Sequence, residues 1–497
     1  MPTVSHSFAA VSTVRARTCT TPELLRDAAR AHPSRTAYVH GEERITYAEL
    51  DRAVDALAWV LVDRGVRHGD VVTLLLPSSI RFAIAYLGAM RAGAITSAIN
   101  LRLGARERDS ILERTDPRVV IDGTWDRDAT PSGTSSTTGL PEVAMDDPAC
   151  IVWTSGTTGA PKGAVYDHER LASISRNIGV LTEPGDRRLS VLPFPHLGYM
   201  TRLWDELANA TTIVLAGEPW SAAETLRLVR DESVTVMTGV PTQWALLLDH
   251  PDCAATDFSG VRLAGIGGAA IAPELVHRMR DRLGCPVVNR YTSTEAGLTT
   301  GTSPDDPPDV VASTVGRPAP EVELRLVAPD GRTVAAGEVG EVMVRAPSTM
   351  REYWRDPDAT AAAFDSEGFL RTGDLGRVDD GGNLRLVGRT KEMYVRGGYN
   401  VYPVEVEAVL SDHDAVASVA VVGAPDPMLG EIGVAFVVPA VESDRASLAR
   451  EPLRAWVAAR LADYKAPDRV VVVDDLPLTS MLKVDKRTLI ARASKED

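Results

Sequence analysis

The feature that most constrains the fold is a loop rich in glycine and hydroxyl side chains, which follows a short apolar run. The run covers residues 149–153, and the loop after it reads Thr154-Ser155-Gly156-Thr157-Thr158-Gly159-Ala160-Pro161-Lys162-Gly163. Glycine lets successive backbone N–H groups turn toward one point and lysine adds a positive charge, so the segment is suited to holding a phosphate chain. It is not a Walker loop, because Gly163 follows Lys162 where Ser or Thr would be needed. A glycine-rich surface turn would explain the glycines but not the lysine.

Lysine is rare in this chain, which gives each lysine added weight. Of 53 basic residues only six are lysine, and arginine supplies the rest. A retained lysine is therefore a candidate for a role that needs a compact ammonium group on a flexible stem. The six are Lys162, Lys391, Lys465, Lys483, Lys486 and Lys495. Lys495 lies in a polar tail, where we expect it to be solvated.

Length, charge and cysteine usage set broad limits. A chain of 497 residues predicts two or more domains. Its formal charge of -15 argues against nucleic acid or an anionic membrane as a partner. Four scattered cysteines without C-x-x-C spacing predict reduced thiols. No apolar run approaches the roughly 18 residues of a membrane span, so we expect a soluble, cytoplasmic protein without membrane insertion. The sequence leaves the oligomeric state open, a homodimer included.

Alternating strand and helix patterns predict layered α/β domains with parallel sheets. Thr46 and Glu49 form a capping box for a helix that runs to Gly65. The same alternation of strand and helix then recurs over residues 71–98, 211–237 and 261–291.

The last third of the chain has a different pattern. From Val322 onward, short strands separated by turn residues predict an antiparallel β subdomain. We therefore expect a large N-terminal domain over residues 1–388 and a small α+β C-terminal domain over residues 389–497. Three segments are expected to be loops or disordered: residues 1–15, 126–141 and 302–309.

Three later clusters complement the glycine-rich loop. The segment Tyr291-Thr292-Ser293-Thr294-Glu295 follows a predicted strand and offers a hydroxyl for phosphate and a carboxylate for Mg²⁺. The segment Arg371-Thr372-Gly373-Asp374 is predicted to put a carboxylate in a tight turn, where it could grip ribose hydroxyls. Arg389 and Lys483 lie near the start and the end of the predicted small domain. Each cluster alone is a weak signal.

Taken in order, these motifs resemble the adenylate-forming superfamily of acyl- and aryl-CoA synthetases, peptide-synthetase adenylation domains and firefly luciferase. The resemblance runs from Thr46-Tyr47-Ala48-Glu49-Leu50 to Lys486. It implies an AMP-forming acid–thiol ligase that uses ATP, Mg²⁺ and coenzyme A. An aryl or medium-chain carboxylic acid would become an acyl-adenylate, pyrophosphate would leave, and the acyl group would pass to CoA.

The resemblance also implies roles for particular residues. The residues implied for catalysis are Lys162, Thr294, Glu295, which would also hold the metal, and Lys483. Those implied for ATP binding are Thr154, Ser155, Gly156, Thr157, Thr158, Gly159, Lys162, Gly268, Ala269, Ala270, Asn289, Tyr291, Thr292, Ser293, Thr294, Asp374 and Arg389. Those expected to border the acid are His196, Tyr199, Gly239, Val240, Thr242 and Gly267, with Trp204 and Gln243 as further candidates. Core packing would explain most of this last group equally well.

The small domain carries the remaining implied roles. Lys391 resembles the hinge of the family, and Gly397 with Gly398 resembles the loop that admits the pantetheine arm of CoA. The chain departs from the family in two places: Thr292 and Leu482 each replace a usual glycine. Leu482 raises the possibility of a degenerate enzyme, because a side chain there restricts the loop that delivers Lys483.

Two functional alternatives stay open. One is a nucleotide sensor without turnover, against which the pair Lys391 and Lys483 argues. The other is an adenylating enzyme whose acceptor is a carrier-protein thiol, an amine or an inorganic anion. Amino-acid activators place an aspartate where this chain has His196, and no carrier domain is attached, so an acid without an α-amino group and CoA as acceptor are favoured.

Overall fold

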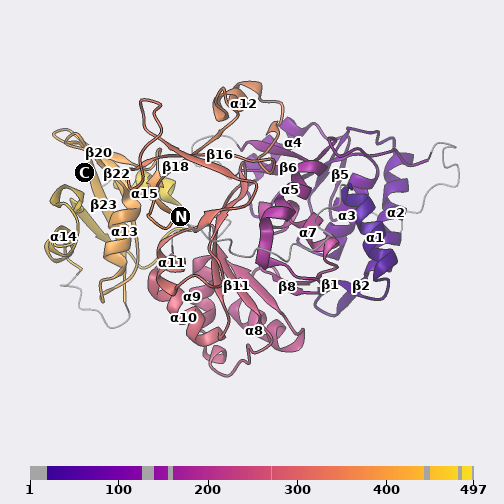
Figure 1. Cartoon of the computed structure of the whole chain (residues 1–497), viewed down its shortest axis with the longest axis horizontal. Helices are drawn as coiled ribbons and strands as arrows, with labels where there is room; N and C mark the ends of the chain where they lie inside the picture. The colour runs from indigo at the N-terminus through magenta and orange to yellow at the C-terminus, as the bar shows by residue number, and fades with distance from the viewer. Residues whose placement is uncertain are drawn as a thin grey trace, which may run out of the picture.

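The computed structural model describes residues 19–125, 139–154, 161–269, 271–440, 448–479 and 484–494. Within these residues the strands form four sheets (Figure 1). The part rich in helices α1 to α5 lies at one end of the long axis, and the C-terminal part with β22, β23 and α13 lies at the other. The predicted fold class is confirmed.

The largest sheet has nine strands in the order β14-β13-β12-β11-β10-β8-β9-β1-β2. All neighbours from β12 to β1 in that order pair in parallel. The strands are β1 (Thr36–His40), β2 (Glu43–Thr46), β8 (Arg187–Ser190), β9 (Thr212–Leu215), β10 (Val236–Gly239), β11 (Leu263–Gly267), β12 (Val287–Ser293), β13 (Gly297–Gly301) and β14 (Arg317–Pro318). Helices α8 (Ala222–Asp231), α9 (Pro241–Asp249) and α10 (Pro273–Leu283) follow the parallel strands β9, β10 and β11 in turn.

The second sheet has six strands in the order β17-β7-β6-β4-β3-β5. They are β3 (Val71–Leu74), β4 (Ile95–Ala98), β5 (Val119–Ile121), β6 (Pro148–Trp153), β7 (Gly163–Asp167) and β17 (Glu352–Tyr353). The largest buried cluster contains residues of both sheets, including Val288 of β12 and Val152 of β6, so the two sheets share a core. Helices of this part of the chain are α1 (Thr21–Ala31), α2 (Tyr47–Asp63), α3 (Ile80–Arg91), α4 (Ala105–Thr115), α5 (His168–Ile178), α6 (Leu197–Met200) and α7 (Leu203–Ala208).

Two smaller sheets follow. The first is antiparallel, as predicted, with β15 (Glu323–Val327), β16 (Gly340–Arg345), β18 (Leu370–Val378) and β19 (Leu384–Arg389). The second contains β20 (Tyr394–Arg396), β21 (Tyr399–Val401), β22 (Val416–Asp426), β23 (Gly430–Pro439) and β24 (Arg469–Val472), together with helices α13 (Pro403–Ser411), α14 (Arg450–Ala458) and α15 (Lys486–Ala493). Buried clusters of this C-terminal part draw only on residues after Arg389.

Local sequence signals account for many of the boundaries. The Thr46 hydroxyl accepts a hydrogen bond from Glu49 N, and the Glu49 carboxylate accepts one from Thr46 N, so the predicted capping box starts α2. The Ser221 hydroxyl caps α8 in the same way, by accepting from Glu224 N.

The structure corrects two predictions. Asp374 lies inside strand β18 and not in a tight turn, because Gly373, at φ +71°, forms a bulge that lets the strand continue. The segment 302–309 is not simply a surface loop: Thr302 is 2% exposed and its hydroxyl accepts from the backbone N–H of Asn289. The expected disorder of residues 1–15 lies outside the described residues, as does most of segment 126–141.

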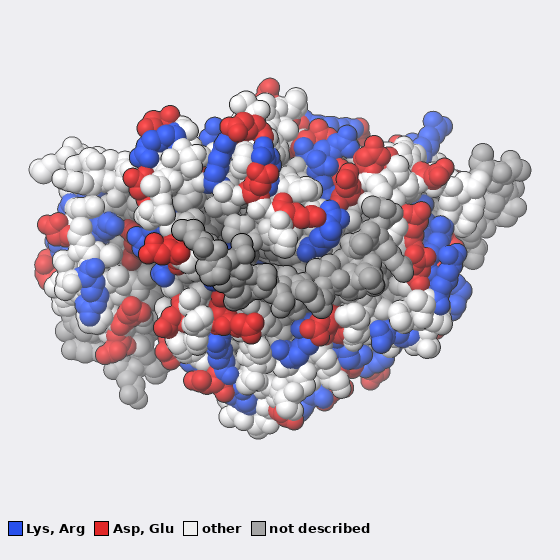
Figure 2. Space-filling model, in the orientation of Figure 1, with Lys and Arg blue, Asp and Glu red and all other residues white. Residues whose placement is uncertain are grey.

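Surface charge is mixed. In Figure 2, acidic and basic side chains alternate over the face shown. Of the helices described, none is long and apolar enough to span a bilayer.

Candidate active site

The glycine-rich loop is closed at its base by two hydrogen bonds between Thr154 and Lys162. Thr154 N donates to Lys162 O over 2.8 Å, and Lys162 N donates to the Thr154 hydroxyl over 3.3 Å. Arg114 of α4 donates to the carbonyl of Pro161. Thr154 follows β6 and Lys162 precedes β7, so these two neighbouring strands place the two residues side by side at the strand ends of the six-stranded sheet. Residues 155–160, the body of the predicted phosphate loop, lie outside the described residues.

Lys162 and Glu295 come together through a tyrosine. The Lys162 ammonium lies 4.8 Å from the ring centroid of Tyr353, and the Tyr353 hydroxyl donates to Glu295 Oε1 over 2.9 Å. Burial, and then the charge of Glu295, raise the pKa of Tyr353 well above its ordinary value, so the phenol keeps its proton and acts as the donor. The sequence alone did not point to Tyr353, because a lone tyrosine in a polar turn region carries no recognisable signal.

Thr294 and Glu295 follow the carboxyl end of β12, as predicted. Tyr166 of β7 donates its hydroxyl to the carbonyl of Thr294 over 2.7 Å, and Ser293 accepts from Ala296 N over 3.1 Å. These contacts fix the turn against the other sheet. Thr292, Ser293 and Thr294 are half-buried there.

A second row of polar side chains connects Tyr291, Asp374 and Arg389. The Tyr291 hydroxyl donates to one Asp374 oxygen, and Arg389 Nε donates to the other over 2.8 Å. Asp374 and Arg389 are directly paired across β18 and β19. Asp374 is 4% exposed, whereas the Arg389 side chain is half exposed. Burial lowers the pKa of Arg389, but the charges of Asp374 and Glu392 together with Tyr291 raise it more, so the guanidinium stays charged.

The strand ends beside this row are shaped by glycine. A Cβ on Gly267 would lie 2.4 Å from the carbonyl oxygen of Arg290, so no side chain fits there, and Gly268 has φ +81°. Ala269 is exposed beside them, and Ala270 is outside the described residues. Asn289, by contrast, is 4% exposed and donates to the carbonyls of Val311 and Thr314. The Asn289 side chain therefore joins β12 to the end of α11 (Pro308–Ser313).

The residues predicted to border the acid divide into two groups: some lie at the ends of strands and helices, and others lie in the core. His196, half-buried, caps α6 by accepting from Gly198 N over 3.1 Å. Gly239 and Val240 lie where β10 ends and α9 begins, with Thr242 in the first turn of that helix. Tyr199 is in the core and not on a pocket wall, because its ring stacks on Phe194 at 3.5 Å and its hydroxyl bonds that of Tyr38.

Trp204 is also a core residue. It is 0% exposed, and its indole N–H donates to the carbonyl of Cys19. Gln243 differs: its side-chain amide joins α9 to the segment after β8, by donating to Val191 O and accepting from Val240 N.

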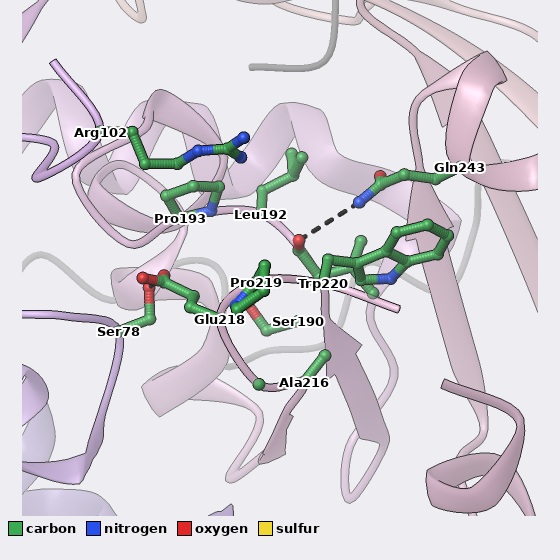
Figure 3. Close-up of a pocket in the computed structure, with 12 residues that line it drawn as sticks. Ser78, Arg102, Ser190, Leu192, Pro193, Ala216, Glu218, Pro219, Trp220 and Gln243 are labelled. Atoms are coloured by element: carbon green, nitrogen blue, oxygen red, sulfur yellow. Dashed lines mark hydrogen bonds between the residues drawn. The ribbon is translucent and has the colours of Figure 1, made fainter. Parts of the chain in front are cut away.

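A pocket opens at the carboxyl ends of β8 and β9 (Figure 3). Figure 3 shows side chains from several elements converging on it, with Gln243 and Trp220 on one side and the hydrogen-bonded pair Ser78 and Glu218 on the other. Gln243, Leu192 and Pro193 connect this pocket to the neighbourhood of Val240 and His196.

The predicted hinge and CoA loop lie at the start of the C-terminal part. Lys391 is exposed in the turn between β19 and β20. Gly397 and Gly398 form the two-residue turn of the β20–β21 hairpin, with φ +56° and +88°. The turn geometry of the hairpin explains why both residues are glycine, and their role in admitting the thiol arm of CoA stays a prediction.

Lys486 adds a link that the sequence did not predict. Its ammonium lies 3.1 Å from Glu392 Oε2, next to Lys391, and 2.9 Å from Glu407 Oε1 on α13. It therefore fastens the start of α15 to the segment that carries the predicted hinge residue Lys391. Leu482 and Lys483 lie outside the described residues.

The donor set around Glu295 fits magnesium. Mg²⁺ is commonly held by one or two carboxylates together with substrate phosphates, which a single Glu295 beside a phosphate loop can supply. Among the residues that the structure describes, no cluster of three His, Cys, Asp or Glu side chains forms a complete protein cage for a metal.

Comparison with known proteins decides the family. The AMP-binding enzyme family matches residues 25–354, and its C-terminal domain matches residues 405–483. The chain belongs to the AMP-binding enzyme family. The base of the glycine-rich loop and the Glu295 turn lie within the first match.

Relatives and solved structures agree over nearly the whole chain. A feruloyl-CoA synthase of Amycolatopsis sp is 35% identical over 92% of this chain and 96% of its own. ATP-bound MatB from Rhodopseudomonas palustris superposes with a TM-score of 0.87 at 28% identity, covering 96% of this chain and 99% of MatB. The amide bond synthetase McbA from Marinactinospora thermotolerans gives 0.84 at 29% identity, covering 95% and 99%.

Proposed function

We propose that this AMP-binding enzyme is an ATP-dependent carboxylate–CoA ligase acting on an aryl or medium-chain acid. The observation that carries the proposal is the convergence of Lys162, Glu295 and Tyr353 at the base of the phosphate loop, together with the row Tyr291, Asp374 and Arg389. The first group suits a triphosphate and the second a ribose. A relative named as a feruloyl-CoA synthase supports an aryl acid and CoA.

The residues divide the work of adenylation. Lys162 offers positive charge to the departing pyrophosphate, and Asp374 with Arg389 orients the ribose. Glu295 would hold Mg²⁺, which supplies charge neutralisation at the phosphates. Lys483 orients the attacking carboxylate. A carboxylate oxygen bonds the α-phosphorus as pyrophosphate leaves, and a thiolate then attacks the acyl carbon, releasing AMP.

The domain arrangement belongs to the same proposal. Residues 1–388 bind ATP and the acid, residues 389–497 turn about Lys391, and Gly397 with Gly398 admit the pantetheine arm. Separate buried clusters on the two sides of this boundary support a moving unit. A cytoplasmic location and a homodimer stay predictions.

A panel of acids assayed with ATP and CoA tests the proposal. We expect acid-dependent exchange of labelled pyrophosphate into ATP, and an acyl-CoA product by mass spectrometry. Absence of exchange with every acid, despite ATP binding, would favour a nucleotide sensor.

A second candidate keeps adenylation but changes the acceptor. Its support is the close superposition on the amide bond synthetase McbA. Exchange without acyl-CoA formation, followed by amide formation when amines are added, would favour this candidate.

A further inference from the structure

The segment of residues 350–354 joins the two parts of the predicted phosphate site, which are the Glu295 turn and the base of the glycine-rich loop. Met350 N donates to Glu295 O over 2.7 Å, and Trp354 N donates to Gly163 O over 2.7 Å. One end of the segment is thus tied to the backbone of Glu295, and the other to the residue after Lys162. Glu295 lies between β12 and β13 of the nine-stranded sheet and Lys162 precedes β7 of the six-stranded sheet, so the segment bridges two sheets.

Tyr353 lies inside this segment and contacts the side chains of Glu295 and Lys162. Strand β17 pairs Tyr353 with Ala164 of β7, and Tyr353 N donates to the Thr360 hydroxyl over 2.9 Å. The tyrosine is 8% exposed, so its ring has little freedom. Its hydroxyl reaches Glu295 Oε1, and its ring face receives the Lys162 ammonium.

The chemistry of each contact fits a supporting role. A phenol that donates to one carboxylate oxygen fixes the plane of the carboxylate and leaves the other oxygen available to a metal. An aromatic face attracts an ammonium group while leaving its N–H donors free for phosphate. We propose that Tyr353 is a positioning residue, which holds the metal-binding Glu295 and the phosphate-binding Lys162 in a fixed relation. The inference rests on the proposed function.

Two substitutions separate the contacts. Tyr353→Phe removes only the hydroxyl, so we expect the Mg²⁺ concentration for half-maximal ATP binding to rise roughly tenfold, as for loss of a residue that supports a metal ligand. At saturating Mg²⁺, ATP affinity should return near the wild-type value. Tyr353→Leu also removes the ring, so ATP affinity should stay several-fold weaker even at saturating Mg²⁺.

The measurement is isothermal titration of ATP over a series of Mg²⁺ concentrations, with unfolding midpoints recorded for each variant. Tyr47→Phe is the matched control. Tyr47 lies in α2, is 1% exposed, and donates its hydroxyl to the carbonyl of Thr211 over 2.7 Å. It should lose similar stability without a change in Mg²⁺ dependence.

A double-mutant comparison gives the sharpest result. In a Glu295→Gln background, Tyr353→Phe should change the Mg²⁺ dependence no further, because the carboxylate it orients is gone. An unchanged Mg²⁺ dependence in Tyr353→Phe, or equal effects in the two backgrounds, would overturn the inference. A wild-type protein that binds no ATP at any Mg²⁺ concentration would instead refute the proposed function.

Discussion

Replacement of Asp374 by alanine separates stability from nucleotide recognition. The carboxylate is buried and accepts from Tyr291 and Arg389. Without it the buried Tyr291 hydroxyl loses its acceptor, which costs about 1–3 kcal/mol. The Arg389 contact adds roughly 0–1 kcal/mol, because that side chain is 50% exposed. We therefore expect the free energy of unfolding to fall by about 2 kcal/mol, mainly through Tyr291.

The double variant Tyr291→Phe, Asp374→Ala should recover most of this stability, since removing both partners leaves no unpaired buried hydroxyl. It should not recover recognition of ribose. Loss of one hydrogen bond to a charged group costs about 1.5–3 kcal/mol, which corresponds to roughly 10- to 100-fold in affinity.

The assay compares kcat/KM for ATP with that for 3′-deoxy-ATP in pyrophosphate exchange. The wild type should prefer ATP by roughly 10- to 100-fold. Both Asp374→Ala proteins should lose this preference, and because the ratio is taken within one protein, a loss of folded enzyme does not affect it. A variant that still discriminates like the wild type would remove Asp374 from the ribose site.

Three further predictions concern the hinge, the metal and an unrelated buried histidine. Lys391→Pro fixes φ at the turn between β19 and β20, so adenylation should persist while thioester formation falls steeply; equal loss of both half-reactions would exclude a hinge. Glu295→Gln keeps the shape but removes the charge, so pyrophosphate exchange should drop and the Mg²⁺ requirement should rise; an unchanged metal titration would contradict the role. Burial lowers the pKa of His168 to about 4, from an ordinary value near 6.5, although Asp147 and Glu23 act in the opposite direction. The unfolded chain therefore takes up this proton first, and stability should fall by roughly 3 kcal/mol as pH drops from 6.5 toward 4; urea unfolding at several pH values should show the loss in the wild type and not in His168→Gln.

Local pattern and composition predicted much of the fold. Capping residues and apolar periodicity located α2, α3, α8 and α10 and the parallel strands between them, because these signals act within a few residues. Strand order was not accessible in the same way. Strand β1 pairs with β9, whose Ile213 lies opposite Tyr38 although the two are 175 residues apart, and nothing in either short apolar run specifies that partner.

In the candidate site, too, local signals were readable from the sequence and tertiary contacts were not. The sequence singled out Glu295, Asp374 and Arg389 as candidates, because charged residues beside glycine and hydroxyl side chains carry a chemical signal, and their roles stay predictions. It missed Tyr353 and misplaced Tyr199, because a tyrosine serves equally well in a core or beside a ligand, and only tertiary packing decides. Asp374 was expected in a turn, since a strand bulge at Gly373 and a turn have the same glycine signature.

The most direct test of the account follows the oxygen atoms of the acid. If a carboxylate oxygen attacks the α-phosphorus of ATP, and the thiol of CoA then releases AMP, one acid oxygen must leave with AMP. A carboxylic acid labelled in both oxygens with ¹⁸O, incubated with ATP, Mg²⁺ and CoA, should yield AMP carrying one ¹⁸O atom by mass spectrometry. Unlabelled AMP, or label found instead in inorganic phosphate alongside ADP, would contradict an acyl-adenylate.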